Sequence, residues 1–227
     1  MKLKFYAPLT VLLTMALFSS VIADQISDNQ NTTPSGFFIN ASGGLAQSQS
    51  YYQEDVASVF GNSSVDVTFP RQSQGAASLG LGYQWGFGKS NSWKNVFLGT
   101  SLNYYYFGRA VDPINSNIGT NGQILSTEYV TLSGIDAEGF VGMYLASPLS
   151  LQVGFGIGGG VGSNQQGLLG VFNVKLAYDV SSNVQLYAQY IRADFTTVGF
   201  AFLGFINASD ETNVAVNSEQ IGIRYLF

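Results

Sequence analysis

Two acidic residues stand where paired carboxylates could do chemistry. Asp136 and Glu138 are two positions apart, so on a β-strand both side chains point to the same side. Two carboxylates on one face can act as general acid and general base, as they do in glycoside hydrolysis. In other segments where apolar and polar residues alternate, Lys175 and Arg224 occupy positions of the polar face. The four charges could therefore form a neutral network in a buried interior instead. We favour this structural ion network over a gate or permeation path, and both of these over catalysis.

A series of glycines offers a second motif. Gly154, Gly156 and Gly159 satisfy the spacing G-x-G-x-x-G, which cradles a pyrophosphate where a strand turns into a helix. Here the glycines continue an alternation of period two, and no amphipathic helix follows them. We therefore interpret them as room for bulky neighbours inside a narrow structure and not as a nucleotide site.

The chain contains no histidine and no cysteine. Zinc sites built on imidazole or thiolate are therefore excluded, and a serine or a water molecule would lack its usual general base. We predict that the protein is not an enzyme and that it has no cofactor and no metal site. Its 227 residues carry a net charge of −5, which makes nucleic acid an unfavourable partner.

The elements that must position these side chains are β-strands. Apolar and polar residues alternate in eight segments, and no apolar run approaches the roughly 20 residues that a spanning helix needs. The segments are Gly36–Gln47, Gly75–Phe87, Trp93–Phe107, a stretch within Tyr129–Leu145, Leu149–Gly162, Leu168–Val180, Asn183–Phe195 and the end of the chain, Gln220–Phe227. Strands that are apolar outside and polar inside are typical of a closed barrel in lipid, because hydrocarbon cannot satisfy an open sheet edge.

The last of these segments is the most specific. Gln220, Gly222, Tyr225 and Phe227 form a pattern that resembles the terminal signal recognised by the bacterial outer-membrane assembly machinery. By length and strand count the chain resembles the small eight-stranded outer-membrane barrels, the group that contains the opacity proteins and the membrane domain of outer membrane protein A. The resemblance implies an all-β fold, an eight-stranded antiparallel up-and-down transmembrane β-barrel.

The start of the chain agrees with this resemblance. Lys2 and Lys4 precede an apolar stretch, and small or apolar residues lead to Ala23, an order typical of a secretory signal peptide. We predict three parts: a signal peptide over residues 1–23, a periplasmic leader over 24–35 and the barrel over 36–227. No further domain is expected after Phe227.

The connections between the expected strands indicate an orientation. Three long ones, Ser48–Gln74, Gly108–Glu128 and Thr196–Asn217, alternate with short ones. Bacterial barrels keep short turns in the periplasm and long loops outside, so both termini are expected to be periplasmic. Aromatic residues would form girdles at the two membrane interfaces. They are Phe37, Trp85, Phe87, Tyr178, Tyr225 and Phe227 at the periplasmic rim, and Tyr104, Tyr106, Tyr129 and Phe195 at the external rim.

The expected function is that of a surface protein of the Gram-negative outer membrane. An eight-stranded barrel has room only for its own side chains, so we predict a structural, adhesion or surface-interaction role through the external loops. A narrow channel for ions or small hydrophobic molecules is the alternative. Phe200, Phe202 and Phe205 are a candidate contact site, unless they pack on neighbouring loops, which we favour. The expected partners of a monomer are outer-membrane lipid and lipopolysaccharide, the assembly machinery, and a host or phage surface ligand.

Overall fold

The computed structural model describes residues 34–58, 61–87, 95–119, 122–162, 165–197 and 210–227. Among these residues the regular elements are nine β-strands: β1 (Gly36–Ser58), β2 (Gly61–Thr68), β3 (Gln72–Gly86), β4 (Val96–Ile118), β5 (Ile124–Ala146), β6 (Leu149–Gly162), β7 (Gln165–Asp179), β8 (Val184–Thr197) and β9 (Asp210–Leu226). No helix in the described part of the chain is long and apolar enough to cross a membrane. The expected signal peptide lies outside the described residues.

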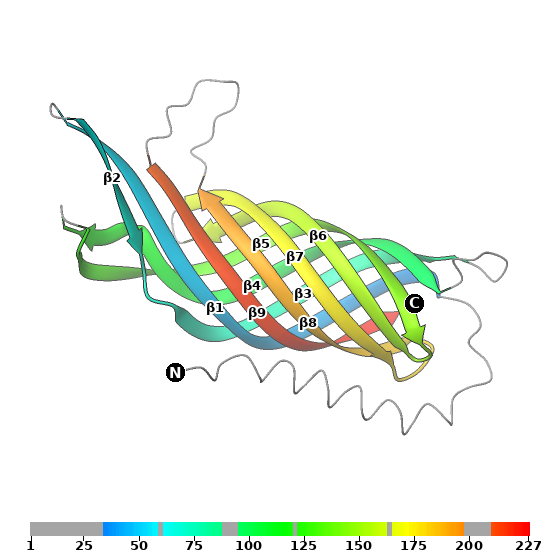
Figure 1. Cartoon of the computed structure of the whole chain (residues 1–227). Coiled ribbons are helices and arrows are strands. Elements are labelled where there is room, and N and C mark those ends of the chain that lie inside the picture. Colours follow the sequence, from blue (N-terminus) through cyan, green and yellow to red (C-terminus); the bar gives the residue numbers. More distant parts are fainter. Residues whose placement is uncertain (1–33, 59–60, 88–94, 120–121, 163–164, 198–209) are drawn as a thin grey trace.

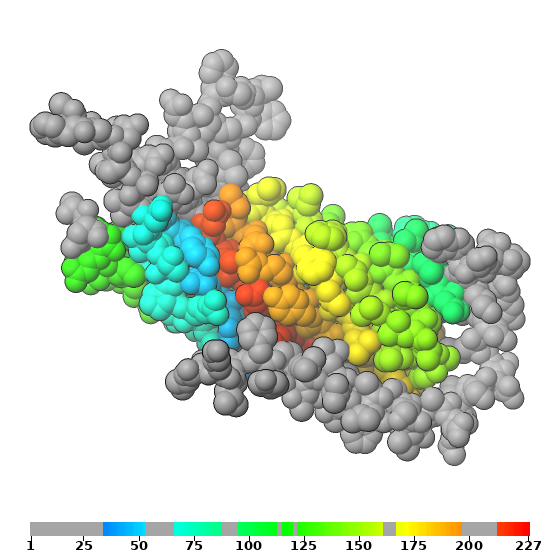
Figure 2. Space-filling view, viewed as in Figure 1, coloured from blue at the N-terminus to red at the C-terminus, as the bar shows by residue number. Residues whose placement is uncertain are grey.

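Eight of the strands close into a ring. Each strand from β3 to β9 pairs antiparallel with its neighbour in sequence, β1 pairs with β3, and β9 pairs back with β1. Figure 1 shows the tilted strands wrapping around one axis, and in Figure 2 the bands of β1, β9, β8, β7 and β6 lie side by side as a wall. The predicted eight-stranded, antiparallel up-and-down barrel is confirmed. The remaining strand, β2, lies outside the ring and pairs only with residues Tyr51–Ser58 of β1.

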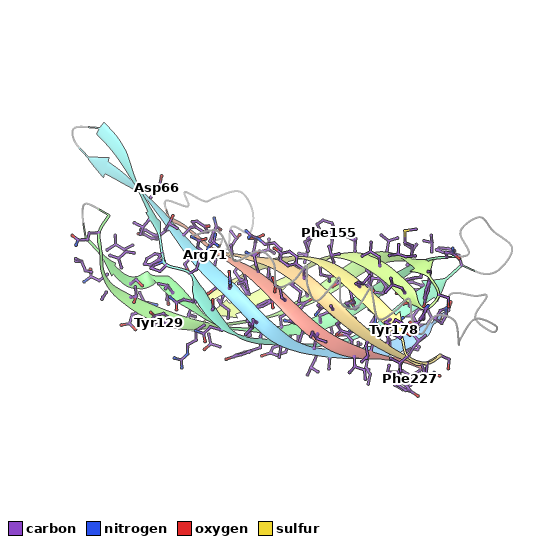
Figure 3. The ribbon with its side chains drawn as sticks, turned by 60° about the horizontal axis from the view of Figure 1, so that its bottom comes forward. Asp66, Arg71, Tyr129, Phe155, Tyr178 and Phe227 are labelled. Atoms are coloured by element: carbon purple, nitrogen blue, oxygen red, sulfur yellow. The ribbon has the colours of Figure 1, made fainter. Side chains whose placement is uncertain are left out.

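The barrel has two different ends. At one end, which we call the turn end, β1 begins, β9 ends, and short connections join β5 to β6 and β7 to β8. At the opposite end, the hairpin end, the β1–β2 and β4–β5 hairpins extend past the rest of the ring (Figure 1). Figure 3 places Tyr178 and Phe227 at the turn end and Asp66 and Tyr129 toward the hairpin end.

The two faces of the wall have opposite chemistry, as the alternation predicts. Phe37, Phe155 and Ile157 on the outside are 68 to 69% exposed. Polar side chains of opposite parity, such as Gln152 and Asn173, are 2 to 3% exposed and point inward. Contact with water would be unfavourable for this outer belt of large apolar side chains, whereas lipid hydrocarbon covers it.

Replacing Phe155 with arginine should lower the free energy of unfolding by about 2 to 4 kcal/mol, because the charge would lie on the outer face near the middle of β6. Reversible urea unfolding in lipid vesicles would measure the change. The matched control is Phe155→Leu, which keeps an apolar side chain at the same outward position. If the two variants unfold at the same urea concentration, the assignment of the faces is wrong.

The expected long loops are largely strand. β1 continues to Ser58 and forms the hairpin with β2, β4 and β5 pair as far as Ile118 and Ile124, and β9 begins at Asp210. The prediction of loops over Ser48–Gln74 and Gly108–Glu128 was therefore wrong. Backbone ladders can continue beyond the membrane without an apolar outer face, so the alternation that marks the spanning part fades there.

One aromatic residue of the expected external girdle is on the other face. Tyr104, Tyr106 and Tyr129 lie outside and are 40 to 50% exposed, but Phe195 is 7% exposed and packs inside against Phe107. The reason is parity, since Phe195 is an odd position on β8, where the even positions Leu186 and Tyr190 face outward.

A bulge brings β4 to β1 at the hairpin end of the barrel, where β3 has ended. The ladder with β5 shifts between Tyr106 and Gly108, and Gly108 has a φ of +78°, which a residue with a Cβ rarely adopts. Ala110 and Val111, consecutive residues beyond the bulge, are both buried. β4 thereby reaches β1, which is not its neighbour in the ring: the hydroxyls of Ser48 and Ser50 donate to the carbonyls of Arg109 and Val111 at 3.0 and 2.6 Å. The β4–β5 hairpin is therefore fixed to β1 at the hairpin end, and we call the joined β1–β2 and β4–β5 hairpins the cap.

Candidate functional site

The interior of the barrel holds the charged residues singled out by the sequence. Asp136, Glu138, Lys175 and Arg224 are 1 to 5% exposed and come from β5, β7 and β9. The ladders explain this convergence, because inward parity on strands that wrap around a narrow ring directs side chains toward one axis. Among the described residues, none of the four forms an ion pair with another: the single pair within 4.0 Å is Arg192–Asp194, on the outer wall.

Amides surround the two carboxylates. Asn103 on β4 donates from Nδ2 to Asp136 Oδ1 at 3.0 Å and to Glu138 Oε2 at 3.1 Å. The same Glu138 oxygen accepts from Asn173 Nδ2 at 2.6 Å and from the Tyr105 hydroxyl at 3.5 Å. Each carboxylate is thus held by neutral donors, which stabilise its charge without a cation in direct contact.

The two cations are held by amide oxygens and aromatic rings. Arg224 donates to Gln152 Oε1 at 3.0 Å, and to the side-chain oxygens of Gln84 and Gln185 at 3.4 Å. Its guanidinium lies 4.3 Å from the ring centroid of Phe38, and the ammonium of Lys175 lies 4.6 Å from that of Tyr187. Cation–π contacts of this kind stabilise a charge that has lost its water.

A third carboxylate belongs to this interior. Asp179, at the end of β7, is 7% exposed and accepts from Gln185 Nε2 at 2.6 Å. Gln185 also accepts from Arg224, so one amide bridges the carboxylate and the guanidinium. The network expected from the sequence did not include Asp179. The described interior therefore has three carboxylates and two cations, and the balance expected from the sequence was incomplete.

Neutral polar residues fill the middle of the barrel. Gln220 accepts from the hydroxyls of Ser42 and Ser78, and Gln189 donates to Gln220 Oε1 at 3.0 Å. Gln220 was predicted as part of the assembly signal, and the structure also gives it a position in this interior cluster. Serine and glutamine at inward parity were the sequence signal for these contacts, but their partners lie on strands distant in sequence.

Two apolar clusters lie in the interior. The smaller one, toward the turn end, lies beside Arg224 and consists of Phe38, Phe97, Phe140 and Leu226. The layer toward the hairpin end, which we call the outer apolar layer, is Ala46, Ala76, Tyr105, Phe107, Ala110, Val130, Leu132, Leu169, Val171, Ile191, Ala193, Phe195, Val214 and Val216. Each of these residues is at most 9% exposed. Since such a layer excludes water, it separates the charged groups from the hairpin end.

The glycine series on β6 gives the carboxylates their space. A Cβ at Gly156 would collide with Asp136 Oδ2, and a Cβ at Gly154 would collide with Glu138 Oε1. Gly154, Gly156 and Gly158 lie within a continuous strand that pairs with β5 and β7. The interpretation of the glycine motif as room for bulky neighbours fits Gly154 and Gly156. It does not fit Gly159, which is exposed and where a Cβ would meet nothing within 4 Å.

The terminal residues of the expected assembly signal lie on both faces of β9. Gly222 points inward, where a Cβ would collide with the ring of Tyr187, while Tyr225 and Phe227 point outward with ring centroids 5.0 Å apart. The Phe227 amide donates to the Phe37 carbonyl at 2.8 Å, so the final residue is part of the β1–β9 closure. Whether the assembly machinery reads these residues stays a prediction.

Replacing Phe227 with serine should leave the protein secreted but poorly inserted, because the terminal aromatic residue of the signal is lost. The yield of heat-modifiable barrel in outer-membrane fractions would measure insertion. Phe37→Ser, which removes an equally exposed aromatic residue from the same rim, is the matched control. Normal yield of the Phe227 variant would rule out the assembly role.

The candidate contact site and the absence of a metal site both stay predictions. Phe200, Phe202 and Phe205 lie outside the described residues. Within the described residues, no group of three or more histidine, cysteine, aspartate or glutamate side chains could hold a metal ion.

Comparison with known proteins gives similarity in fold. No family model and no curated protein matches the chain. Among solved structures, Neisserial surface protein A is 15% identical, with 86% of this chain and 100% of that chain covered and a TM-score of 0.47. The outer membrane protein OprG from Pseudomonas aeruginosa is 12% identical over 88% and 99% of the two chains, with a TM-score of 0.42. The outer membrane protease OmpT from Escherichia coli is 11% identical over 88% and 99%, with a TM-score of 0.38.

Proposed function

We propose that the protein is a sealed barrel of the Gram-negative outer membrane that acts through the surface of its hairpin end. The observation that carries this proposal is the filled interior: buried polar side chains occupy its middle, and the outer apolar layer covers them toward the hairpin end. An aqueous pore needs a continuous polar path, whereas the outer apolar layer interrupts it.

The cap supports a surface role. Val67 and Phe69, beside and beyond the end of β2, pack with Val111 of β4, so the two hairpins share a small core of their own. On the outside of the β4–β5 hairpin, Leu125 and Tyr129 are 61% and 50% exposed. A rigid hairpin that presents apolar and aromatic side chains is suited to contact with a host or phage surface ligand. In this proposal the hairpin end is extracellular and both termini are periplasmic.

The interior charges are part of the same proposal and serve structure. Asp136 and Glu138, held by Asn103 and Asn173, would fix the registers of β4, β5 and β7. Arg224, held by three glutamines, would do the same for β9, and Lys175 would contribute its charge from β7. The complete lack of histidine further supports a role without catalysis.

Planar-bilayer recordings of the refolded protein test this proposal. The sealed barrel should be nearly silent at voltages where a barrel with a continuous water path conducts. Detergent buffer without protein is the blank, and heat-modifiable migration of the same sample confirms that it has folded. Steady, ion-selective currents from the unmodified protein would contradict the proposal and favour the alternative, a narrow channel.

A further inference from the structure

The outer wall has a depression at the level of the apolar belt. It encloses about 480 Å³ over β9, β1, β3, β4 and β5, and its lining includes Ala41, Leu79, Leu102, Tyr104 and Ile223. Ala41 is the small residue at its floor, because the ladders place Leu79 and Ile223 directly beside it on the two neighbouring strands. Its volume is in the range of sites that bind a ligand of moderate size.

Two arginines lie between this depression and the hairpin end, on the same side of the ring. Arg71 and Arg109 are both exposed. The Gln74 side chain adjoins the backbone at Gly108. Arg71 is three residues from Gln74 and Arg109 is one residue from Gly108, so the two arginines lie on adjacent segments of the chain. Arg71 donates from Nε to Gln49 at 3.1 Å, and in the described residues neither arginine has a carboxylate within ion-pair distance. Their positive charge is therefore available to an anion.

The arginines lie within the depth of one leaflet from the depression. Tyr104, at the rim of the depression, is five residues from Arg109 on β4, with the bulge at Gly108 between them. On a strand tilted by roughly 35 to 45°, five residues span at most about 14 Å along the barrel axis. Half of a hydrocarbon core of roughly 30 Å is about 15 Å deep. Between them Tyr106 is 40% exposed, the position that interfacial aromatic residues occupy.

We propose that this strip of wall, from Arg71 and Arg109 down to Ala41, binds one molecule of a phosphorylated lipid of the outer leaflet. The two guanidinium groups would take the phosphate, which they match in charge and hydrogen-bonding geometry. An acyl chain would fill the depression beside Ala41. The inference rests on the proposed orientation, in which the hairpin end is extracellular, and it adds a lipid site to the surface role.

Native mass spectrometry of the full-length barrel tests the site. The probes are lipid A, enzymatically dephosphorylated lipid A and phosphatidylcholine, each added at equal concentration. We expect the protein to retain lipid A in preference to the other two. The double variant Arg71→Gln, Arg109→Gln should retain about tenfold less lipid A, because two charge-assisted contacts are lost. Ala41→Trp, which fills the depression, should lower retention by a similar factor.

Two matched controls define the specificity. Arg192→Gln removes an exposed arginine that is already paired with Asp194, and Ala188→Trp enlarges a small outward residue elsewhere on the wall; both should retain lipid A as the unmodified protein does. Heat-modifiable migration confirms the fold of every variant. Undiminished retention in the double arginine variant, or in Ala41→Trp, would overturn the proposal. So would a shift of Ala41→Trp from dimer to monomer with no change in lipid, because the occupant would then be a second copy. Since no current is measured, failure here is distinct from failure of the sealed-barrel proposal.

Discussion

Replacing Arg224 with alanine is expected to lower the free energy of unfolding by about 3 to 5 kcal/mol, the range measured when one partner of a buried charged network is removed. The side chain is 2% exposed and donates to three glutamine side chains. Its loss would leave those amide oxygens without their donor and the carboxylates with one cation fewer. Reversible urea unfolding from lipid vesicles would measure the change.

The control for Arg224 is Arg192→Ala. Arg192 and Asp194 form an ion pair at 2.8 Å, but their side chains are 40% and 54% exposed. Exposed pairs typically contribute about 1 kcal/mol or less, so this variant should unfold close to the unmodified protein. Equal losses for the two arginines would mean that the interior is not the stabilising site proposed here.

Replacing Lys175 with methionine tests whether the interior is dry. Methionine keeps most of the length of the side chain and removes its charge, so the effect reports electrostatics more than packing. In a dry interior the excess negative charge near Glu138 should destabilise the barrel by about 3 to 5 kcal/mol. The outer apolar layer leads us to expect a loss in this range.

The alternative outcome has its own signature. In a wet lumen, water and salt would screen the charges, and the loss for Lys175→Met would fall well below this range and vary with ionic strength. Lys175→Arg, which keeps the charge, is the matched control and should lose less. A small, salt-dependent loss would contradict the sealed interior and would strengthen the case for a channel.

The spanning part of the barrel was predictable from sequence because lipid imposes a simple rule. Each wall residue meets either hydrocarbon or the interior, so residues such as Phe155 and Asn173 reveal their faces by type alone. Beyond the membrane both faces of a strand can be polar. The extension of β1 to Ser58 and the pairing of β2 therefore left no period-two apolar signal, and the sequence indicated a loop instead.

The interior was predictable as a set of residues and not as a set of contacts. Parity alone directs Asp136 and Glu138 inward, but the stagger of the ring decides which side chains meet. That stagger brings Asn103 to both carboxylates and three glutamines to Arg224. Parity likewise directs Asp179 inward, but it does not show that Asp179 lies close to Gln185 and Arg224.

The bonds that join β4 to β1 do not depend on the closure of the ring. Ser48 and Ser50 belong to β1, which pairs with β3, and β3 pairs with β4, so these strands form one continuous sheet. The β1–β9 pairing that completes the barrel is a separate contact. A folding intermediate whose seam between β1 and β9 is still open could therefore already hold the β1–β2 and β4–β5 hairpins together.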